Sequence, residues 1–238
     1  STSASSSTCF PALEANTTGT SNTAIGAFSL EANTTGYWNT AIGRESLQAN
    51  TTGNYNTAIA AHSLEANTTG YSNTAIGTYA LKENTTGYRN TAVGIDSLQE
   101  NTTGYNNAAF GVFSLESNTT GNNNVAIGDF AGNSNSTGSN NLFLGYKAGF
   151  SETSSNKLLI ANSDSSTPLI YGDFSTGALA LGNDGDETGA IQIGTSGTRD
   201  ITIGSANATT VVYGLRTSNV TDTNGKTMIR KDSATGAI

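Results

Sequence analysis

The chain has 238 residues, a formal charge of −8 and only 12% charged residues, and it contains 28 glycines. The acidic balance argues against nucleic-acid binding, because phosphate recognition needs clustered Lys and Arg. No apolar run reaches the length of a membrane helix, so we expect no membrane insertion, and the single cysteine, Cys9, allows no disulfide within the chain.

One motif dominates the chain after a Ser/Thr-rich lead-in and cap at residues 1–11. From residue 12 to about 150 the motif recurs every 17 residues without insertion. Its Asn-Thr/Ser-Thr-Gly block begins at Asn16, Asn33, Asn50, Asn67, Asn84, Asn101, Asn118 and Asn135. Its second block, typified by Asn-Thr-Ala-Ile-Gly, begins at Asn22, Asn39, Asn56, Asn73, Asn90, Asn107, Asn124 and Asn141. A fixed short period without slippage is typical of a solenoid.

Alternating polar and apolar residues predict two short strands per coil, Ser29–Asn33 and Asn39–Gly43, and hence an all-β parallel β-roll. We expect the Leu, Ile and Thr columns to point inward and the Ala column outward. The expected inward Leu column is Leu13, Leu30, Leu47, Leu64, Leu81, Leu98 and Leu115, followed by Gly132 and Gly149. The other inward columns start at Ile25 and Thr23, and the outward column is Ala24, Ala41, Ala58, Ala75, Ala92, Ala109 and Ala126. The change to Gly predicts that the roll narrows or meets a neck at its end.

The two Asn blocks predict ladders in which amides one coil apart hydrogen-bond along the axis and stabilise the turns. Each coil is thin and has few inward apolar side chains. At about 25 cal/mol per Å² of buried apolar area, one coil does not offset about 1.5 kcal/mol of ordering cost per residue. We therefore expect a homotrimer, with three rolls side by side and the Ala column near the interface.

The blocks Asn22-Thr23-Ala24-Ile25-Gly26 and Asn124-Val125-Ala126-Ile127-Gly128 resemble the head repeat of trimeric autotransporter adhesins of the YadA type. The resemblance covers about residues 12–150. It implies a left-handed β-roll, a homotrimer and an adhesive surface projected from a cell. We expect this chain to depart from the family by its added Asn-Thr-Thr-Gly turn and by the lack of a coiled-coil stalk and membrane anchor. The repeats of this chain also resemble those of phage tail fibres.

The 17-residue step stops near Asn156. Residues 157–160 and 168–174 predict a strand, a turn and a strand, and four short strands closed by Gly182, Gly194, Gly204 and Gly214 follow. We expect residues 151–214 to form an intertwined β-prism or triple β-helix, and residues 215–238 a linker. Asn156–Phe174 resembles the segment that precedes an intramolecular chaperone in phage tail fibres, and residues 215–238 would be the approach to that domain.

The sequence offers little for catalysis, and we expect neither an enzyme nor a cofactor. His62, the only histidine, lies at a variable turn position and is expected to be an exposed polar residue. The acidic turn Asn183–Glu187 lacks the spacing of a calcium loop, so no metal site is predicted. Asp129, Glu152, Asp164 and Asp173 are carboxylates, but nothing in the sequence brings two together as glycoside hydrolysis requires.

The pair of residues after each Asn-Thr-Thr-Gly is variable and rich in aromatics. Such residues on a constant solenoid form an exposed stripe at about 4.8 Å per coil, and flat aromatic rings suit sugar recognition. The receptor-binding candidates are Tyr37, Trp38, Tyr55, Tyr71, Tyr88, Arg89 and Tyr105. The alternative is that these rings only cover the turn backbone or pack between chains. The opposite turn is the second candidate surface: Phe28, Arg44, Glu45, His62, Tyr79, Asp96, Phe113 and Phe130.

Taken together, these patterns predict a trimeric extracellular fibre segment, from a phage tail fibre or a bacterial adhesin head. We expect it to bind a cell-surface receptor or glycan. The alternatives are a structural spacer, an ice-binding solenoid bearing Thr ladders, and a polysaccharide-degrading tailspike.

Overall fold

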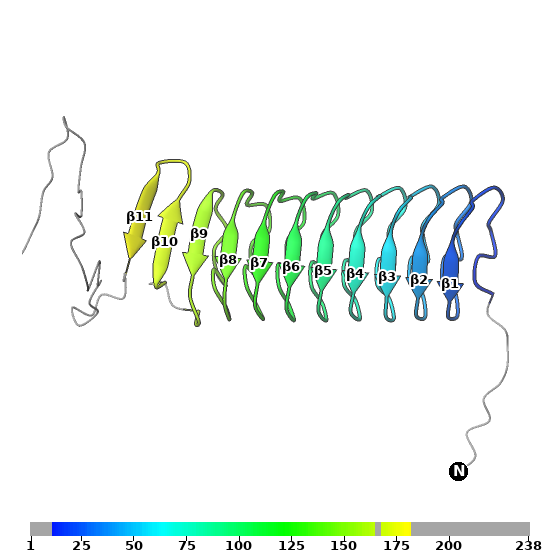
Figure 1. Ribbon diagram of the computed structural model, residues 1–238, viewed down its shortest axis with the longest axis horizontal. Coiled ribbons are helices and arrows are strands. Elements are labelled where there is room, and N and C mark those ends of the chain that lie inside the picture. The colour runs from blue at the N-terminus through cyan, green and yellow to red at the C-terminus, as the bar shows by residue number, and fades with distance from the viewer. Residues whose placement is uncertain (1–10, 165–167, 182–238) are drawn as a thin grey trace, which may run out of the picture. The chain divides into compact units, whose positions relative to one another are not determined.

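The computed structural model describes residues 11–164 and 168–181. Its strands form one 11-stranded sheet in chain order, and its repeats form a parallel β-solenoid of about 8 turns (Figure 1). The repeat strands are β1 (Thr23–Ile25), β2 (Thr40–Ile42), β3 (Thr57–Ile59), β4 (Thr74–Ile76), β5 (Thr91–Val93), β6 (Ala108–Phe110), β7 (Val125–Ile127) and β8 (Leu142–Leu144). The last three strands are β9 (Lys157–Ile160), β10 (Ile170–Asp173) and β11 (Ala178–Leu181).

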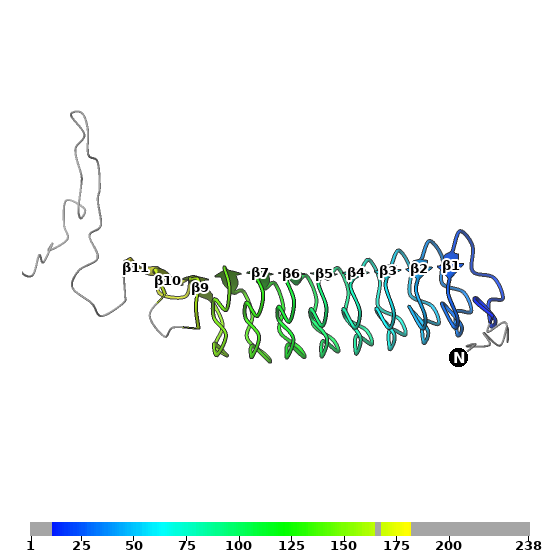
Figure 2. The ribbon, with the colours of Figure 1, turned by 90° about the horizontal axis from the view of Figure 1, so that it is seen from below.

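The coils stack in exact register at the 17-residue step. Thr40 pairs with Thr57 and Ala41 with Ala58, and every pairing from β1 to β9 is parallel. In the view turned by 90°, the strands β1–β8 line one face of the solenoid and the rest of each coil extends away from that face (Figure 2). No helix among the described residues is long and apolar enough to cross a bilayer.

Each coil contains one strand, and the second strand predicted at Ser29–Asn33 is wrong. This segment still donates to the next coil, from Leu30 N–H to Ser46 O at 3.1 Å and from Ala32 N–H to Gln48 O at 3.0 Å. Leu30, however, has φ 50°, in the left-handed region. The chain must close a coil within 17 residues, and this left-handed residue bends the backbone where a strand would carry it straight on.

The prediction that the Ile and Thr side chains of β1–β8 point inward and the Ala side chains outward is also wrong. The inward Leu column is confirmed. Ala41 is fully buried, Ile42 is 36% exposed and Ile25 is 59% exposed. Thr40 lies on the outer face beside Ile42. Alternation fixes which residues share a face but does not say which face points inward. Asn39 decides which face of the strand points inward, because it is fully buried and lies on the same face as Ala41.

The interior is half polar, and the predicted Asn ladders are confirmed. Asn50 Nδ2 donates to Asn33 Oδ1 of the preceding coil at 2.8 Å and to Gly53 O of its own turn at 3.1 Å. In the second ladder, Asn56 N–H donates to Asn39 Oδ1 at 3.0 Å, and Asn56 Nδ2 donates to Gly70 O at 2.9 Å. Buried amides cost little when they are hydrogen-bonded in this way. The rest of the interior is formed by the buried Leu and Ala columns.

The change from Leu to Gly at the end of the solenoid accompanies a larger residue on the strand. Phe143, at the position that Ala holds in the earlier coils, is fully buried. A Cβ at Gly132 would lie 2.5 Å from Phe143 Cδ2, and one at Gly149 would lie 2.4 Å from Cδ1. The two glycines therefore make room for one large ring.

The sheet continues past the repeat into an antiparallel meander. Leu158 of β9 pairs with Leu142 of β8, and β10 and β11 then add antiparallel. The strand–turn–strand predicted from residue 157 is confirmed, and β11 corresponds to the strand predicted before Gly182. The strands predicted before Gly194, Gly204 and Gly214, the lead-in at residues 1–10 and the linker lie outside the described residues.

Candidate functional site

The turn after each Asn-Thr-Thr-Gly is built alike in every coil, because the Asn side chain and the Gly hold it. Asn33 Nδ2 donates to Gly36 O at 3.1 Å. A Cβ at Gly36 would lie 2.4 Å from Asn33 Oδ1 and 2.5 Å from Gly53 O, so only glycine fits. The next two residues project from this fixed turn and carry all seven predicted binding residues.

Three of the predicted residues form a compact aromatic group, named here the three-ring cluster: Tyr37, Trp38 and Tyr55. The Trp38 and Tyr55 ring centroids are 4.9 Å apart and those of Tyr37 and Tyr55 5.4 Å apart, both edge to face. Trp38 is 55% exposed and Tyr55 46%. Burial of the hydroxyl, followed by the charge and hydrogen bond of Tyr37, raises the pKa of Tyr55. In these edge-to-face contacts the edge of one ring lies against the face of another, and about half of the Trp38 and Tyr55 surface stays exposed for a ligand to contact.

The remaining predicted residues form a separate group, the tyrosine stack: Tyr71, Tyr88, Tyr105 and the adjoining Arg89. Tyr88 stacks on Tyr71 and on Tyr105, each at 4.9 Å between centroids. The Arg89 guanidinium lies 5.9 Å from the Tyr88 centroid. Both faces of Tyr88 are therefore covered. The stripe expected from the sequence is divided into two groups, and Trp38 and Tyr55 of the three-ring cluster are more exposed than Tyr71 of the stack.

The backbone at the second variable position is left-handed in every coil. The φ angles are 55° at Trp38, 59° at Tyr55 and 54° at Arg89. Later coils place Asn106 and Asn123 here, and Asn tolerates this region. A bulky residue at such a position costs about 1–2 kcal/mol. Trp38 and Tyr55 are thus held where folding alone favours Asn.

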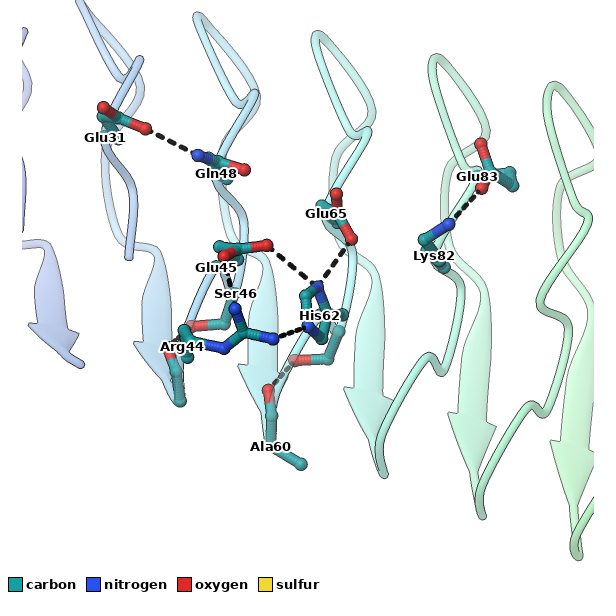
Figure 3. A network of polar contacts seen from close by, with 12 residues as sticks. Glu31, Arg44, Glu45, Ser46, Gln48, Ala60, His62, Glu65, Lys82 and Glu83 are labelled. Atoms are coloured by element: carbon teal, nitrogen blue, oxygen red, sulfur yellow. Dashed lines mark hydrogen bonds and ion pairs between the residues drawn. The ribbon is translucent and has the colours of Figure 1, made fainter. Parts of the chain in front are cut away.

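The opposite turn brings together residues that sequence reasoning did not combine. The His62 side chain is only 12% exposed, so the expectation of an exposed residue is wrong. Its Nδ1 lies 2.9 Å from Glu65 Oε2 and 3.1 Å from Glu45 Oε2 (Figure 3). The sequence signal was the repeat itself: Glu45 is one 17-residue step before His62, and Glu65 is three residues after it.

Further along the same turn, the side chains are mainly apolar. Phe113 and Phe130 stack at 4.9 Å, and Tyr146 meets Phe130 edge to face at 6.5 Å. Asp96 lies earlier on this turn, and burial, with a smaller contribution from the Glu116 charge, raises the pKa of its carboxyl.

A cavity of about 310 Å³ lies where the last coil meets β9 and β10. It is lined by Gly149, Phe150, Ser151, Glu152, Leu159, Asp164 and Tyr171. The fold thus brings Glu152 and Asp164, which the sequence did not connect, to one cavity. Both carboxylates already have partners: Asp164 Oδ2 lies 3.4 Å from Lys147 Nζ, and Glu152 Oε1 accepts from Ser154 N–H at 2.8 Å.

Comparison with protein-family models, with curated proteins and with solved structures finds no match to this chain. What is shown is the β-solenoid itself, with 17-residue coils and stacked Asn ladders.

Proposed function

We propose that this chain is a segment of an extracellular fibre that binds a cell-surface receptor or glycan through the three-ring cluster. The observation that carries the proposal is the placement of Trp38 and Tyr55. Both rings are about half exposed on a left-handed backbone that Asn would occupy at lower cost. Large exposed aromatics on a rigid scaffold favour recognition, because they bury area at low entropic cost. In this proposal the segment is neither an enzyme nor a cofactor protein, and it belongs to a phage tail fibre or a bacterial adhesin head.

The binding test replaces aromatics by the residue that suits this backbone. Trp38→Asn and Tyr55→Asn keep the turn conformation while removing the rings, and Ser72→Asn in the same column is the matched control. We expect each aromatic replacement to weaken binding to target cells or to an arrayed glycan at least about tenfold, in line with the cost of losing a binding hot spot. Ser72→Asn should bind like the parent. Unchanged binding in both aromatic variants would reject the three-ring cluster and favour a structural spacer.

We propose further that three copies pack through the outer face of the sheet. The Ala column cannot serve as the interface, because Ala41, Ala58 and Ala75 are fully buried within one chain. The outer face instead presents a continuous apolar row. Its members are Ile25, Ile42, Ile59, Ile76, Val93, Phe110, Ile127 and Leu144. Exposed apolar patches of this kind mark association surfaces. A left-handed coil completes this proposed fibre. Of the residues predicted to form an intertwined β-prism or triple β-helix, 151–214, those up to 181 include the β9–β11 meander instead, and the rest lie outside the described residues.

Sedimentation tests the assembly. The parent chain should sediment as a trimer, and Ile76→Lys on the sheet face should shift it towards monomer. Glu83→Lys, at an exposed turn position, is the control and should remain trimeric. A parent chain that stays monomeric at all concentrations would refute the trimer.

Ice binding is the second candidate, because Thr40, Thr57, Thr74 and Thr91 lie in register on the outer sheet face. Against it, the same column continues as Ala108, Val125 and Leu142, which ends the hydroxyl array. Thermal hysteresis of the purified chain separates the candidates: ice binding requires it, and the fibre proposal expects none.

A further inference from the structure

Among the described residues, Glu45, His62 and Glu65 bring one ring nitrogen and two carboxylate oxygens within 4.8 Å of one another. They come from two adjacent coils, and both carboxylates point at the same ring nitrogen, Nδ1 of His62 (Figure 3). We propose that these three residues form a binding site for a divalent transition-metal cation of the zinc type. The site is independent of the proposed recognition function.

The histidine ring is held in place before any ligand arrives. His62 stacks on Tyr79 with centroids 5.0 Å apart and an interplanar angle of 24°. Its side chain is 12% exposed, and those of Glu45 and Glu65 are 19% and 28% exposed. A fixed ring and half-buried carboxylates lower the entropic cost of assembling a coordination sphere.

The hydrogen bonds around His62 provide only one ring N–H for two carboxylates. The Arg44 guanidinium contacts His62 Nε2 and also donates to Glu45 Oε1 at 2.8 Å. A guanidinium has only donors, so Nε2 accepts and the ring hydrogen lies on Nδ1. That single hydrogen faces both Glu45 and Glu65. The guanidinium bonds to Glu45, whereas the Lys82 ammonium, which also attracts Glu65, is hydrogen-bonded to Glu83. Two cationic groups thus accompany three carboxylates. A divalent cation in place of the hydrogen would contact both carboxylates and neutralise the remaining charge.

The spacing suits a zinc-like ion. Zinc binds His nitrogen and carboxylate oxygen at about 2.0–2.2 Å, so that tetrahedral ligands lie about 3.4 Å apart. The Nδ1–oxygen separations of 2.9 and 3.1 Å need only a small opening to reach that value. Three protein ligands leave a fourth position for water. Calcium prefers about six to eight oxygen ligands, which this site does not supply.

Arg44 competes with the metal in this arrangement. A cation on Nδ1 moves the ring hydrogen to Nε2, which then no longer accepts from the guanidinium. The Arg44 side chain is 58% exposed and can move into solvent. Removal of this arginine should therefore strengthen metal binding, whereas it would loosen a purely structural ion-pair network.

The test uses the fact that the chain contains one histidine, so its imidazole gives a single set of NMR signals. The untagged chain with Cys9→Ser is titrated with zinc and followed by NMR and calorimetry. We expect a saturable shift of the imidazole signals at one zinc per chain, and a raised melting temperature through binding to the folded state. Glu45→Gln and Glu65→Gln should each weaken zinc binding about tenfold or more. Arg44→Gln should tighten it.

Glu31→Gln is the matched control, because Glu31 occupies the position of Glu65 two coils earlier and bonds to Gln48 instead of a histidine. Its zinc affinity should equal that of the parent. The proposal is overturned if millimolar zinc leaves the imidazole signals unmoved, or if His62→Gln binds zinc as tightly as the parent. It is also overturned if Arg44→Gln weakens binding, or if calcium displaces zinc at comparable concentration.

Discussion

The first seven coils and the eighth fill the same interior in two different ways. In the earlier coils a small Ala on the strand faces a Leu from the opposite segment, as Ala75 and Leu81 do. In the eighth, Phe143 takes the strand position and Gly132 and Gly149 take the Leu positions. The polar half changes less: the ladder of Asn107, Asn124 and Asn141 continues into the eighth coil, while in the other ladder Asn118 Oδ1 has no hydrogen-bond partner among the described residues. The apolar half is thus constrained in total volume, and the polar half in residue identity.

The largest expected effect comes from removing the Phe143 ring, which takes the strand position that Ala holds in the earlier coils. Phe143→Ala should lower the free energy of unfolding by about 3–5 kcal/mol, because Gly132 and Gly149 have no side chain to fill the cavity. Chemical denaturation measures the change. A cost below about 1 kcal/mol would show that the eighth coil is not filled by Phe143.

The same pair of replacements, Phe for Ala on the strand and Gly for Leu opposite it, can be introduced one coil earlier. Ala126→Phe alone should overpack the interior, and Leu115→Gly alone should leave a cavity. Together they recreate the eighth-coil arrangement, with Gly132 already in place. We expect the double variant to be more stable than the sum of the two single effects implies. Strict additivity would contradict volume compensation.

The ladder prediction is the next in size. Asn67 Nδ2 donates to Asn50 Oδ1 at 2.8 Å and Asn67 Oδ1 accepts from Asn84 Nδ2 at 2.8 Å, all within the interior. Asn67→Ala should cost about 2–3 kcal/mol, because it leaves buried polar groups unpaired. The control is Asn106→Gly on the exposed turn, which keeps a residue suited to φ 55°. Equal losses in denaturation would refute the special role of the interior ladder.

A smaller effect, of opposite sign, is expected on the variable turn. Arg89→Asn places the residue best suited to φ 54° beside Asn106, and it extends the exposed amide row that joins Asn106 to Asn123. The variant should gain about 1 kcal/mol of stability. Thermal unfolding measures it, and the reverse change, Asn106→Arg, should lose a similar amount. If Arg89→Asn is destabilising, the backbone at this position is not strained by its side chain.

The smallest expected effect is a loss of stability of the β9–β11 meander at low pH. Lys157 Nζ donates to Asp173 Oδ2 at 2.7 Å, and this bond, ahead of those from Ser175, lowers the pKa of Asp173 well below its usual value. A lowered carboxyl pKa stabilises the folded state above the unfolded value of 3.8, and this contribution is lost as the pH falls below it. Hydrogen-exchange protection of the β9–β10 amides should therefore fall in acid relative to β3–β4. Asp173→Asn should remove the difference in pH response between the two regions.

Much of the fold could be predicted from residue spacing alone. The 17-residue step predicted the coils, the aligned Asn residues predicted the ladders, and the alternation at residues 157–174 predicted the β9–β10 pair. The fixed step also placed the seven receptor-binding candidates on one turn. Their division into two groups was not predictable, because ring orientation depends on contacts between coils such as that of Trp38 with Tyr55.

The sequence by itself determined the period, because a repeat without insertions makes each residue equivalent to the one 17 positions away. Only the tertiary structure decided which strand face points inward, how Phe143 replaces Leu, and that Glu45 and Glu65 meet at His62. The physical reason is that these features depend on the opposite wall of the coil or on the neighbouring coil. Burial of Asn39 became favourable only when its hydrogen bonds were completed there, and that fixed the position of every side chain on the strand.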